Sequence, residues 1–86
     1  MKGFRRDNPD DLMPEQGQYG KLSNGDWFAC IPVGYDQSGF QLVAGLSQHT
    51  VVEHEDGTIT VSPSILVRGQ HRTWHGYLER GVFRRA

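Results

Sequence analysis

The length, composition and charge of this chain exclude several classes of protein. Eighty-six residues, of which 36% are hydrophobic and 22% charged, have room for one small core, so we exclude two independent functional domains. Nine Lys and Arg against ten Asp and Glu give a formal charge of -1. The chain therefore lacks the overall basicity of a non-specific nucleic-acid binder and the acidity of a DNA mimic.

The cysteine content and the apolar runs indicate the compartment. Cys30 is the only cysteine, which excludes an intramolecular disulfide and a thiolate-rich zinc site and fits a reducing compartment. The basic residues near Met1 are not followed by an apolar stretch of secretory length, and no window approaches the roughly 18 to 20 apolar residues of a membrane span. We expect a cytoplasmic protein with no membrane partner and no cofactor.

Residues 1–26 contain few β-branched or aliphatic side chains, and prolines and glycines interrupt any hydrophobic period. This composition predicts a mobile arm with at most one short helical turn around residues 10–16, with acidic residues at the N-terminal end of the turn. An arm that folds on a partner is the alternative.

From Trp27 onward, short apolar runs are separated by glycines every 8 to 12 residues or so, a pattern typical of a small all-β domain. We predict an antiparallel sandwich or barrel-like domain over residues 27–86. The expected strands are Trp27 to Ile31, Phe40 to Gly45, His49 to Glu55, Thr58 to Ser62, Ile65 to Val67, Thr73 to Leu78 and Val82 to Arg84.

The Asp56-Gly57 dipeptide is the strongest turn signal, because Asp-Gly favours a two-residue hairpin loop. A two-residue loop sets the register of the flanking strands. The paired residues would then be Glu55 and Thr58, His54 and Ile59, Glu53 and Thr60, Val52 and Val61, and Val51 and Ser62. The core face would carry Val52, His54, Ile59 and Val61, leaving Thr58 and Thr60 toward water.

Two further turn signals follow. Pro63 cannot donate to a ladder, so we expect the strand to end or bend there and resume in another direction or sheet. Arg80-Gly81 predicts a second hairpin in which Glu79 opposes Val82 and Leu78 opposes Phe83. A three-residue loop with a bulge at Gly81 is equally compatible with the sequence.

The four histidines and the cysteine do not form a recognisable catalytic or metal-binding pattern. On a strand, His49 and His54 face opposite sides, and His71 and His75 lie about 13 Å apart at 3.3 Å per residue. The run from Trp27 to Ile31 predicts that Cys30 is a buried small hydrophobe rather than a nucleophile. No phosphate loop or nucleophile elbow is present, so we expect neither a metal site nor an enzyme.

The segment Arg72-Thr73-Trp74-His75-Gly76-Tyr77-Leu78-Glu79-Arg80 concentrates the residue types that anchor interfaces. We predict a partner-binding site formed by Trp74, His75, Tyr77, Arg80 and Arg72. Strand alternation would place Trp74, Gly76 and Leu78 on one side and Thr73, His75 and Tyr77 on the other, and by this pattern Trp74 completes the core. Arg84 and Arg85 are interpreted as a solvated tail.

The stretch from Thr58 through Ser62-Pro63-Ser64-Ile65-Leu66-Val67 to Gly69, followed by Trp74-His75-Gly76-Tyr77 to Phe83, resembles a small domain family of unknown function found in bacteriophage and prophage genomes. The resemblance covers roughly residues 27–83. Members carry a cysteine next to the hairpin histidine and further cysteines upstream, as in a zinc knuckle; here Trp74 precedes His75, and only Cys30 lies upstream. The resemblance implies a phage or mobile-element origin in a bacterial cytoplasm rather than a reaction.

Three functions remain at this stage. The first is a non-enzymatic, phage-type module that binds a host bacterial protein or a second copy of itself, since small β domains leave edge strands to be paired. The second is a single-stranded nucleic-acid binder. It would stack bases on Trp27, Phe28, Trp74 or Tyr77 and bind phosphates through Arg68, Arg72, Arg80 and Arg84. The third, an enzyme, would need Cys30 beside a histidine.

Overall fold

The computed structural model turns most of the apolar runs into strands. It describes residues 1–8, 15–32, 43–68 and 73–86. The regular secondary structure of these residues consists of strands alone. Among them the structure therefore contains no long apolar helix that could cross a bilayer. The strands are β1 (Phe4–Arg5), β2 (Gln18–Lys21), β3 (Trp27–Cys30), β4 (Val43–Gly45), β5 (Thr50–Glu53), β6 (Ile59–Arg68), β7 (Thr73–Glu79) and β8 (Val82–Arg85).

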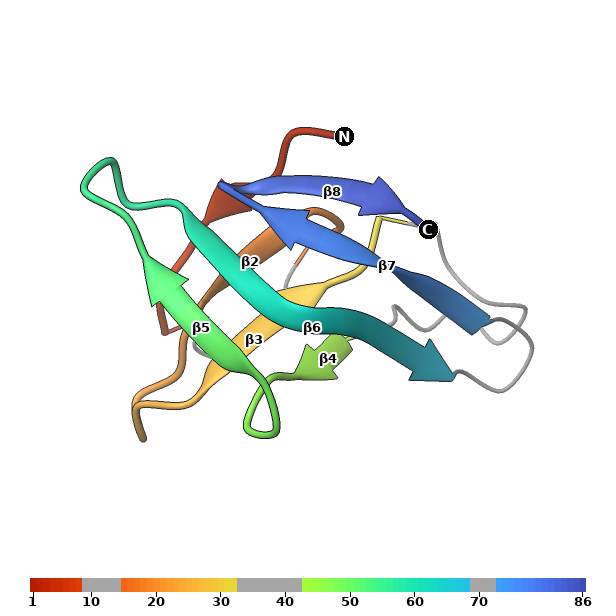
Figure 1. The fold of residues 1–86 in the computed structure, drawn as a ribbon. Coiled ribbons are helices and arrows are strands. Elements are labelled where there is room, and N and C mark those ends of the chain that lie inside the picture. Colours follow the sequence, from red (N-terminus) through yellow and green to blue (C-terminus); the bar gives the residue numbers. More distant parts are fainter. Residues whose placement is uncertain (9–14, 33–42, 69–72) are drawn as a thin grey trace.

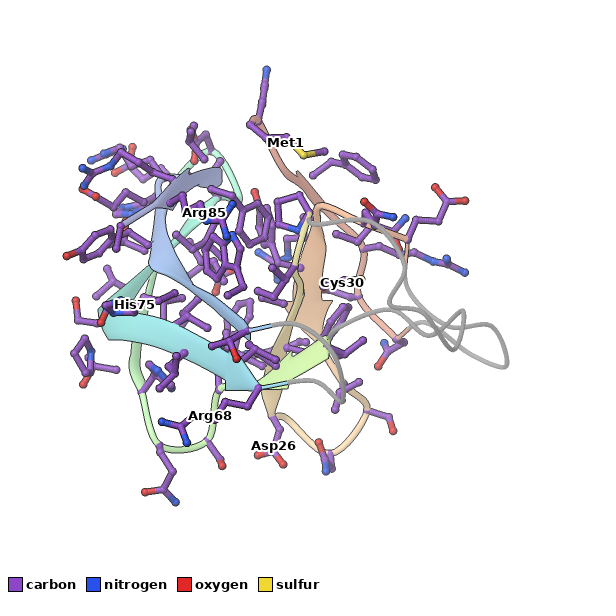
Figure 2. All side chains as sticks on the ribbon, turned by 90° about the vertical axis from the view of Figure 1, so that its right-hand side faces the viewer. Met1, Asp26, Cys30, Arg68, His75 and Arg85 are labelled. Carbon is purple, nitrogen blue, oxygen red and sulfur yellow. The ribbon has the colours of Figure 1, made fainter. Side chains whose placement is uncertain are left out.

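The strands form two four-stranded sheets, with the orders β1-β2-β3-β4 and β5-β6-β7-β8. All neighbouring strands are antiparallel except β1 and β2, which run parallel. Figure 1 shows β5, β6 and β7 in front of β2 and β3, and the turned view in Figure 2 shows side chains packed between the two sheets. The predicted all-β class and the sandwich architecture are confirmed.

The core lies between the sheets because each strand sends alternate residues inward. The second sheet contributes Ile59, Ile65 and Leu78, which are completely buried. Three aromatic rings complete the core. The Phe83 ring makes edge-to-face contacts with Trp74, at 6.3 Å between centroids, and with Tyr19 of the first sheet, at 6.4 Å.

The N-terminal residues correct the predicted boundary at residue 26. Tyr19, inside the predicted arm, is buried in the core, and β1 and β2 belong to the first sheet. Residues 1–3 run beside β8, where the Gly3 N–H donates to the Gly81 carbonyl at 2.7 Å and the Phe83 N–H donates to the Met1 carbonyl at 2.8 Å. Backbone hydrogen bonding, which needs no apolar side chains, recruits this segment. The helical turn expected around residues 10–16 falls largely outside the described residues.

The first hairpin differs by one residue from the predicted register. The pairs are Thr50 with Ser62, Val51 with Val61, Val52 with Thr60, and Glu53 with Ile59. The loop has three residues, ends on Gly57 at φ 88°, and is closed by a hydrogen bond from the His54 N–H to the Thr58 carbonyl at 2.8 Å. Both the Thr58 N–H and its hydroxyl donate to Asp56 Oδ1, which favours this longer loop.

The shifted register exchanges the inward-facing and outward-facing residues of β5 but leaves those of β6 as predicted. Ile59 and Val61 are buried as predicted, whereas Val52 is 50% exposed and Val51 packs against the core in its place. Thr58 and Thr60 are partly exposed. A slip of one residue moves every side chain of a strand to its other face, so the predictions that Val52 and His54 face the core were wrong.

The other two turn predictions have different outcomes. β6 continues through Pro63 in the same sheet, although the pairing with β7 shifts between Val61 and Ile65, so Pro63 interrupts the register without ending the strand. The second hairpin has the predicted two-residue loop, with Glu79 opposite Val82 and Leu78 opposite Phe83. Both loop residues have positive φ, 44° at Arg80 and 76° at Gly81.

Candidate functional site on the outer face of the second sheet

Strand β7 divides its side chains between the core and the outer face of the second sheet. Trp74, Gly76 and Leu78 are buried, while Thr73 and His75 are exposed and Tyr77 is half-buried. This is the predicted alternation. In Figure 2, His75 lies on the side of the β5–β8 sheet away from the first sheet. The outer face is therefore presented by a regular strand, which holds its side chains in a defined spacing.

Tyr77 and Arg84 form the centre of this face. They are directly paired across β7 and β8, and the Arg84 guanidinium lies over the Tyr77 ring, 4.8 Å from its centroid. Arg84 also donates to the Glu79 carboxylate, which raises the pKa of the arginine. The guanidinium is thus held in place by a ring and a carboxylate, and its charge is balanced locally.

Leu66 and His75 extend the face across β6. They are paired between β6 and β7, and Leu66 is 52% exposed because its neighbour Ile65 faces the core. His75 Nε2 lies 2.8 Å from the Ser64 hydroxyl, and the His75 ring is tilted against Tyr77 at 6.4 Å. We call the five residues Ser64, Leu66, His75, Tyr77 and Arg84 the outer patch.

A shallow pocket of about 400 Å³ adjoins the outer patch. It lies where the shift in pairing places Ser62, Pro63 and Ser64 between two paired positions of β6. Its walls combine hydroxyls, one aromatic ring and one ion pair, contributed by Thr60, Val61, Ser62, Pro63, Ser64, Tyr77, Glu79 and Arg84. Such a lining can accept a side chain that is apolar along its length and polar at its tip.

The structure brings together only two of the five residues predicted for the partner-binding site. His75 and Tyr77 lie in the outer patch. Trp74 is only 3% exposed and packs in the core, so its place in the predicted contact set was wrong. Arg80 lies in the β7–β8 turn, beside a second depression of about 450 Å³ lined by Glu53, His54, Glu55 and Asp56. Arg72 lies outside the described residues.

The aromatic rings considered for base stacking are already covered. Phe28 and Trp74 are buried. Trp27 is half-buried beneath two cations, with Arg5 at 5.1 Å and Lys21 at 5.2 Å from the ring centroid. Tyr77 lies beneath Arg84. None of these four rings offers a bare face of the kind that stacks on a nucleobase.

The histidines make hydrogen bonds rather than a shared centre. His54 Nε2 lies 2.7 Å from the Thr60 hydroxyl, and His49 Nε2 lies 3.2 Å from the Ser64 carbonyl. In the parts of the chain that the structure describes, no three His, Cys, Asp or Glu side chains are placed to hold a metal ion. His71 falls outside those parts.

Cys30 is fully buried in β3, and burial raises the pKa of its thiol to about 11. A thiol with this pKa is protonated at neutral pH, whereas the nucleophilic form of cysteine is the thiolate. This environment is that of a packing residue.

The partner-binding site predicted from the sequence lacks Ser64, Leu66 and Arg84. For Arg84 the sequence predicts only a phosphate contact of the nucleic-acid alternative or a solvated tail, although one signal for its true position was present. The predicted hairpin pairs Leu78 with Phe83, and extending that register by one residue pairs Tyr77 with Arg84. Arg84 therefore lies beside Tyr77 on the outer face of the sheet and is not part of a solvated tail. Leu66 offered no such signal, because its exposure depends on the register of β6 beyond Pro63.

Comparison with known proteins returns no match for this chain among family models, curated proteins or solved structures.

Proposed function

We propose that the chain is a non-enzymatic protein-binding module that contacts its partner through the outer patch. The observation that carries this proposal is that Leu66, half of which is exposed, lies beside a cluster of three polar or aromatic side chains. In that cluster the Tyr77 ring contacts both Arg84 and His75, so these side chains are held in place before any partner binds. Tyrosine and arginine are the residue types most enriched among residues that dominate binding energy. Because these side chains are held before binding, little conformational entropy is lost in a complex.

The charge on this face favours a protein partner over a nucleic acid. Arg84 is neutralised by Glu79, and the Tyr77 ring is covered by Arg84, so neither group is free for a phosphate or a base. Nucleic-acid binding depends on exposed cations and releases counterions, which makes it steeply dependent on salt. An apolar residue ringed by polar groups has the anatomy of a protein interface.

The resemblance of residues 27–83 to a phage and prophage domain family supplies the rest of the proposal. It suggests a protein of the bacterial host as the partner and the host cytoplasm as the location. The near-neutral formal charge of -1 is compatible with binding that does not rely on long-range attraction.

Site-specific photo-crosslinking in bacterial extract tests this proposal. A photoreactive phenylalanine analogue replaces Leu66 in one version of the full chain and Leu22 in the control, since Leu22 is 37% exposed and lies outside the outer patch. We expect a discrete protein adduct from position 66 that is absent from position 22. No adduct at either position, or the same adducts at both, would contradict the proposal.

A fluorescence titration with oligo(dT) and oligo(U) separates the alternative. We expect no saturable binding at about 50 mM salt, where electrostatic binding is strongest. Saturable binding that weakens steeply as salt rises would replace the protein-binding proposal with the nucleic-acid one.

A further inference from the structure

The open edge of the second sheet carries an inference that is independent of the outer patch. β5 lies at one end of the order β5-β6-β7-β8 (Figure 1). At the other end, residues 1–3 cover β8 through backbone hydrogen bonds. Among the described residues, no segment pairs with β5 on the side away from β6.

The hydrogen-bonding pattern shows which backbone groups lie at this edge. The His54 N–H closes the hairpin onto Thr58, and bonded pairs alternate with non-bonded pairs in an antiparallel ladder. Thr50 and Val52 therefore point their N–H and C=O groups toward β6. Val51 and Glu53 point theirs outward, which leaves two donors and two acceptors available for another strand.

β5 lacks several of the devices that block natural sheet edges. It reads Thr-Val-Val-Glu, contains no lysine or proline, and pairs with β6 without a bulge. An inward-pointing charge is another such device, and the one charged residue of the strand, Glu53, has its charge neutralised by Arg5. Arg5 reaches Glu53 from the face between the sheets, because Glu53 is paired with the inward-facing Ile59.

We propose that β5 pairs with β5 of a second copy of this chain, antiparallel and across a twofold axis at Val52. In that register each Val51 exchanges both backbone hydrogen bonds with Glu53 of the other copy, so all the outward groups are used. The two Val52 side chains, each 50% exposed, meet across the axis and bury each other. The strand is thus complementary to itself, as a twofold interface requires.

This pairing joins the second sheets of the two copies into one continuous sheet. A twofold axis perpendicular to a sheet keeps equivalent faces on the same side, so the two outer patches would point in one direction. The contact involves one four-residue strand from each copy, so we expect weak association with a dissociation constant on the order of 10 µM to 1 mM.

Sedimentation equilibrium of the full chain from about 10 µM to 1 mM tests the pairing, with Val52→Lys, Val52→Glu and Val82→Lys as variants. Val82 is the matched control because it is also a valine, is 44% exposed against 50% for Val52, and lies on β8 at the opposite end of the sheet, outside the outer patch. We expect a monomer–dimer equilibrium for the wild type and for Val82→Lys. Val52→Lys should raise the dissociation constant at least about tenfold, because like charges then face each other across the axis.

Mixing the two Val52 variants provides a rescue. An equimolar mixture of Val52→Lys and Val52→Glu should dimerise at low salt more strongly than either variant alone, because opposite charges meet. A wild type that is monomeric up to about 1 mM, a Val52→Lys variant that dimerises like the wild type, or a mixture without rescue would overturn the proposal.

Amide hydrogen exchange of the wild type provides evidence that needs no variant. Protection of the Val51 and Glu53 amides should rise with protein concentration, and unchanged protection would contradict the pairing. Failure here would leave the outer-patch proposal intact, since crosslinking at position 66 does not depend on β5.

Discussion

Arg5 on β1 donates to the Glu53 carboxylate on β5 and so joins the two sheets at one end of the sandwich. The same guanidinium donates to the Gly57 carbonyl at 3.1 Å, pairs with Asp7 and covers the Trp27 ring. These contacts involve both sheets and the first hairpin. One side chain from a segment with few apolar residues therefore couples the N-terminus to the rest of the domain.

Replacing Arg5 with Met should lower the free energy of unfolding by about 1 kcal/mol. The loss is modest because the Arg5 and Glu53 side chains are 24% and 45% exposed, and solvent screens the pair. Urea denaturation measures the change. The control Arg6→Met, which alters a neighbouring arginine that forms no ion pair with any of the described residues, should change the free energy by less than about 0.5 kcal/mol.

Asp7 makes this cluster sensitive to acid. Hydrogen bonds from the Arg5 guanidinium and from the Lys21 N–H lower the pKa of Asp7 below its ordinary value of 3.8. The carboxylate therefore stabilises the fold above about pH 4, and this stabilisation is lost as pH falls through the lowered pKa of the folded state.

Unfolding measurements at several pH values test the role of Asp7. The wild type should exceed Asp7→Asn in stability by up to about 1 kcal/mol above pH 5, with the gap closing toward pH 2. A gap that is independent of pH would show that the carboxylate charge is not responsible.

The second hairpin can be stabilised at Arg80. Its φ of 44° suits Asn or Gly better than Arg, and Asn-Gly is the preferred loop for this turn. Arg80→Asn should raise the free energy of unfolding by about 0.5 to 1 kcal/mol in thermal or urea denaturation.

Gly81→Ala is the opposing control for that hairpin. Gly81 has φ 76°, and an added Cβ would lie 2.6 Å from Tyr19 Oη, so the substitution should destabilise the fold by at least about 1 kcal/mol. If Arg80→Asn and Gly81→Ala changed the free energy of unfolding in the same direction, this account of the turn would be contradicted.

Trp74 and Tyr77 should separate stability from binding, because they lie on opposite faces of β7. Trp74→Phe shrinks a buried ring that contacts Phe83 and should lower the free energy of unfolding by about 1 to 2 kcal/mol without weakening partner binding. Tyr77→Ser should weaken partner binding while lowering the free energy of unfolding by less than about 1 kcal/mol. The two variants are compared by urea denaturation and by crosslinking yield at position 66.

The sequence predicted the architecture where local chemistry determines the geometry. Alternation along β7 gave the correct inward and outward residues, and Arg80-Gly81 gave the correct register for β7 and β8. The first hairpin failed because Asp56 binds Thr58 and lengthens the loop by one residue, a choice that the Asp-Gly pair alone does not specify.

The remaining errors concern long-range contacts. β1 and β2 join the domain through backbone hydrogen bonds and through Tyr19, and their sequence lacks a strong strand pattern. The outer patch depends on how β6 resumes pairing after Pro63, which brings Ser64 and Leu66 beside His75. Neither relationship has a signature in neighbouring residues.

The central claim, that the outer patch binds a protein, is tested most directly by titration calorimetry with the partner identified by crosslinking. Leu66→Lys should weaken binding at least about tenfold, whereas Leu22→Lys should leave it unchanged, and raising salt from about 50 to 300 mM should alter the dissociation constant less than about threefold. Equal affinities for Leu66→Lys and the wild type would contradict the claim.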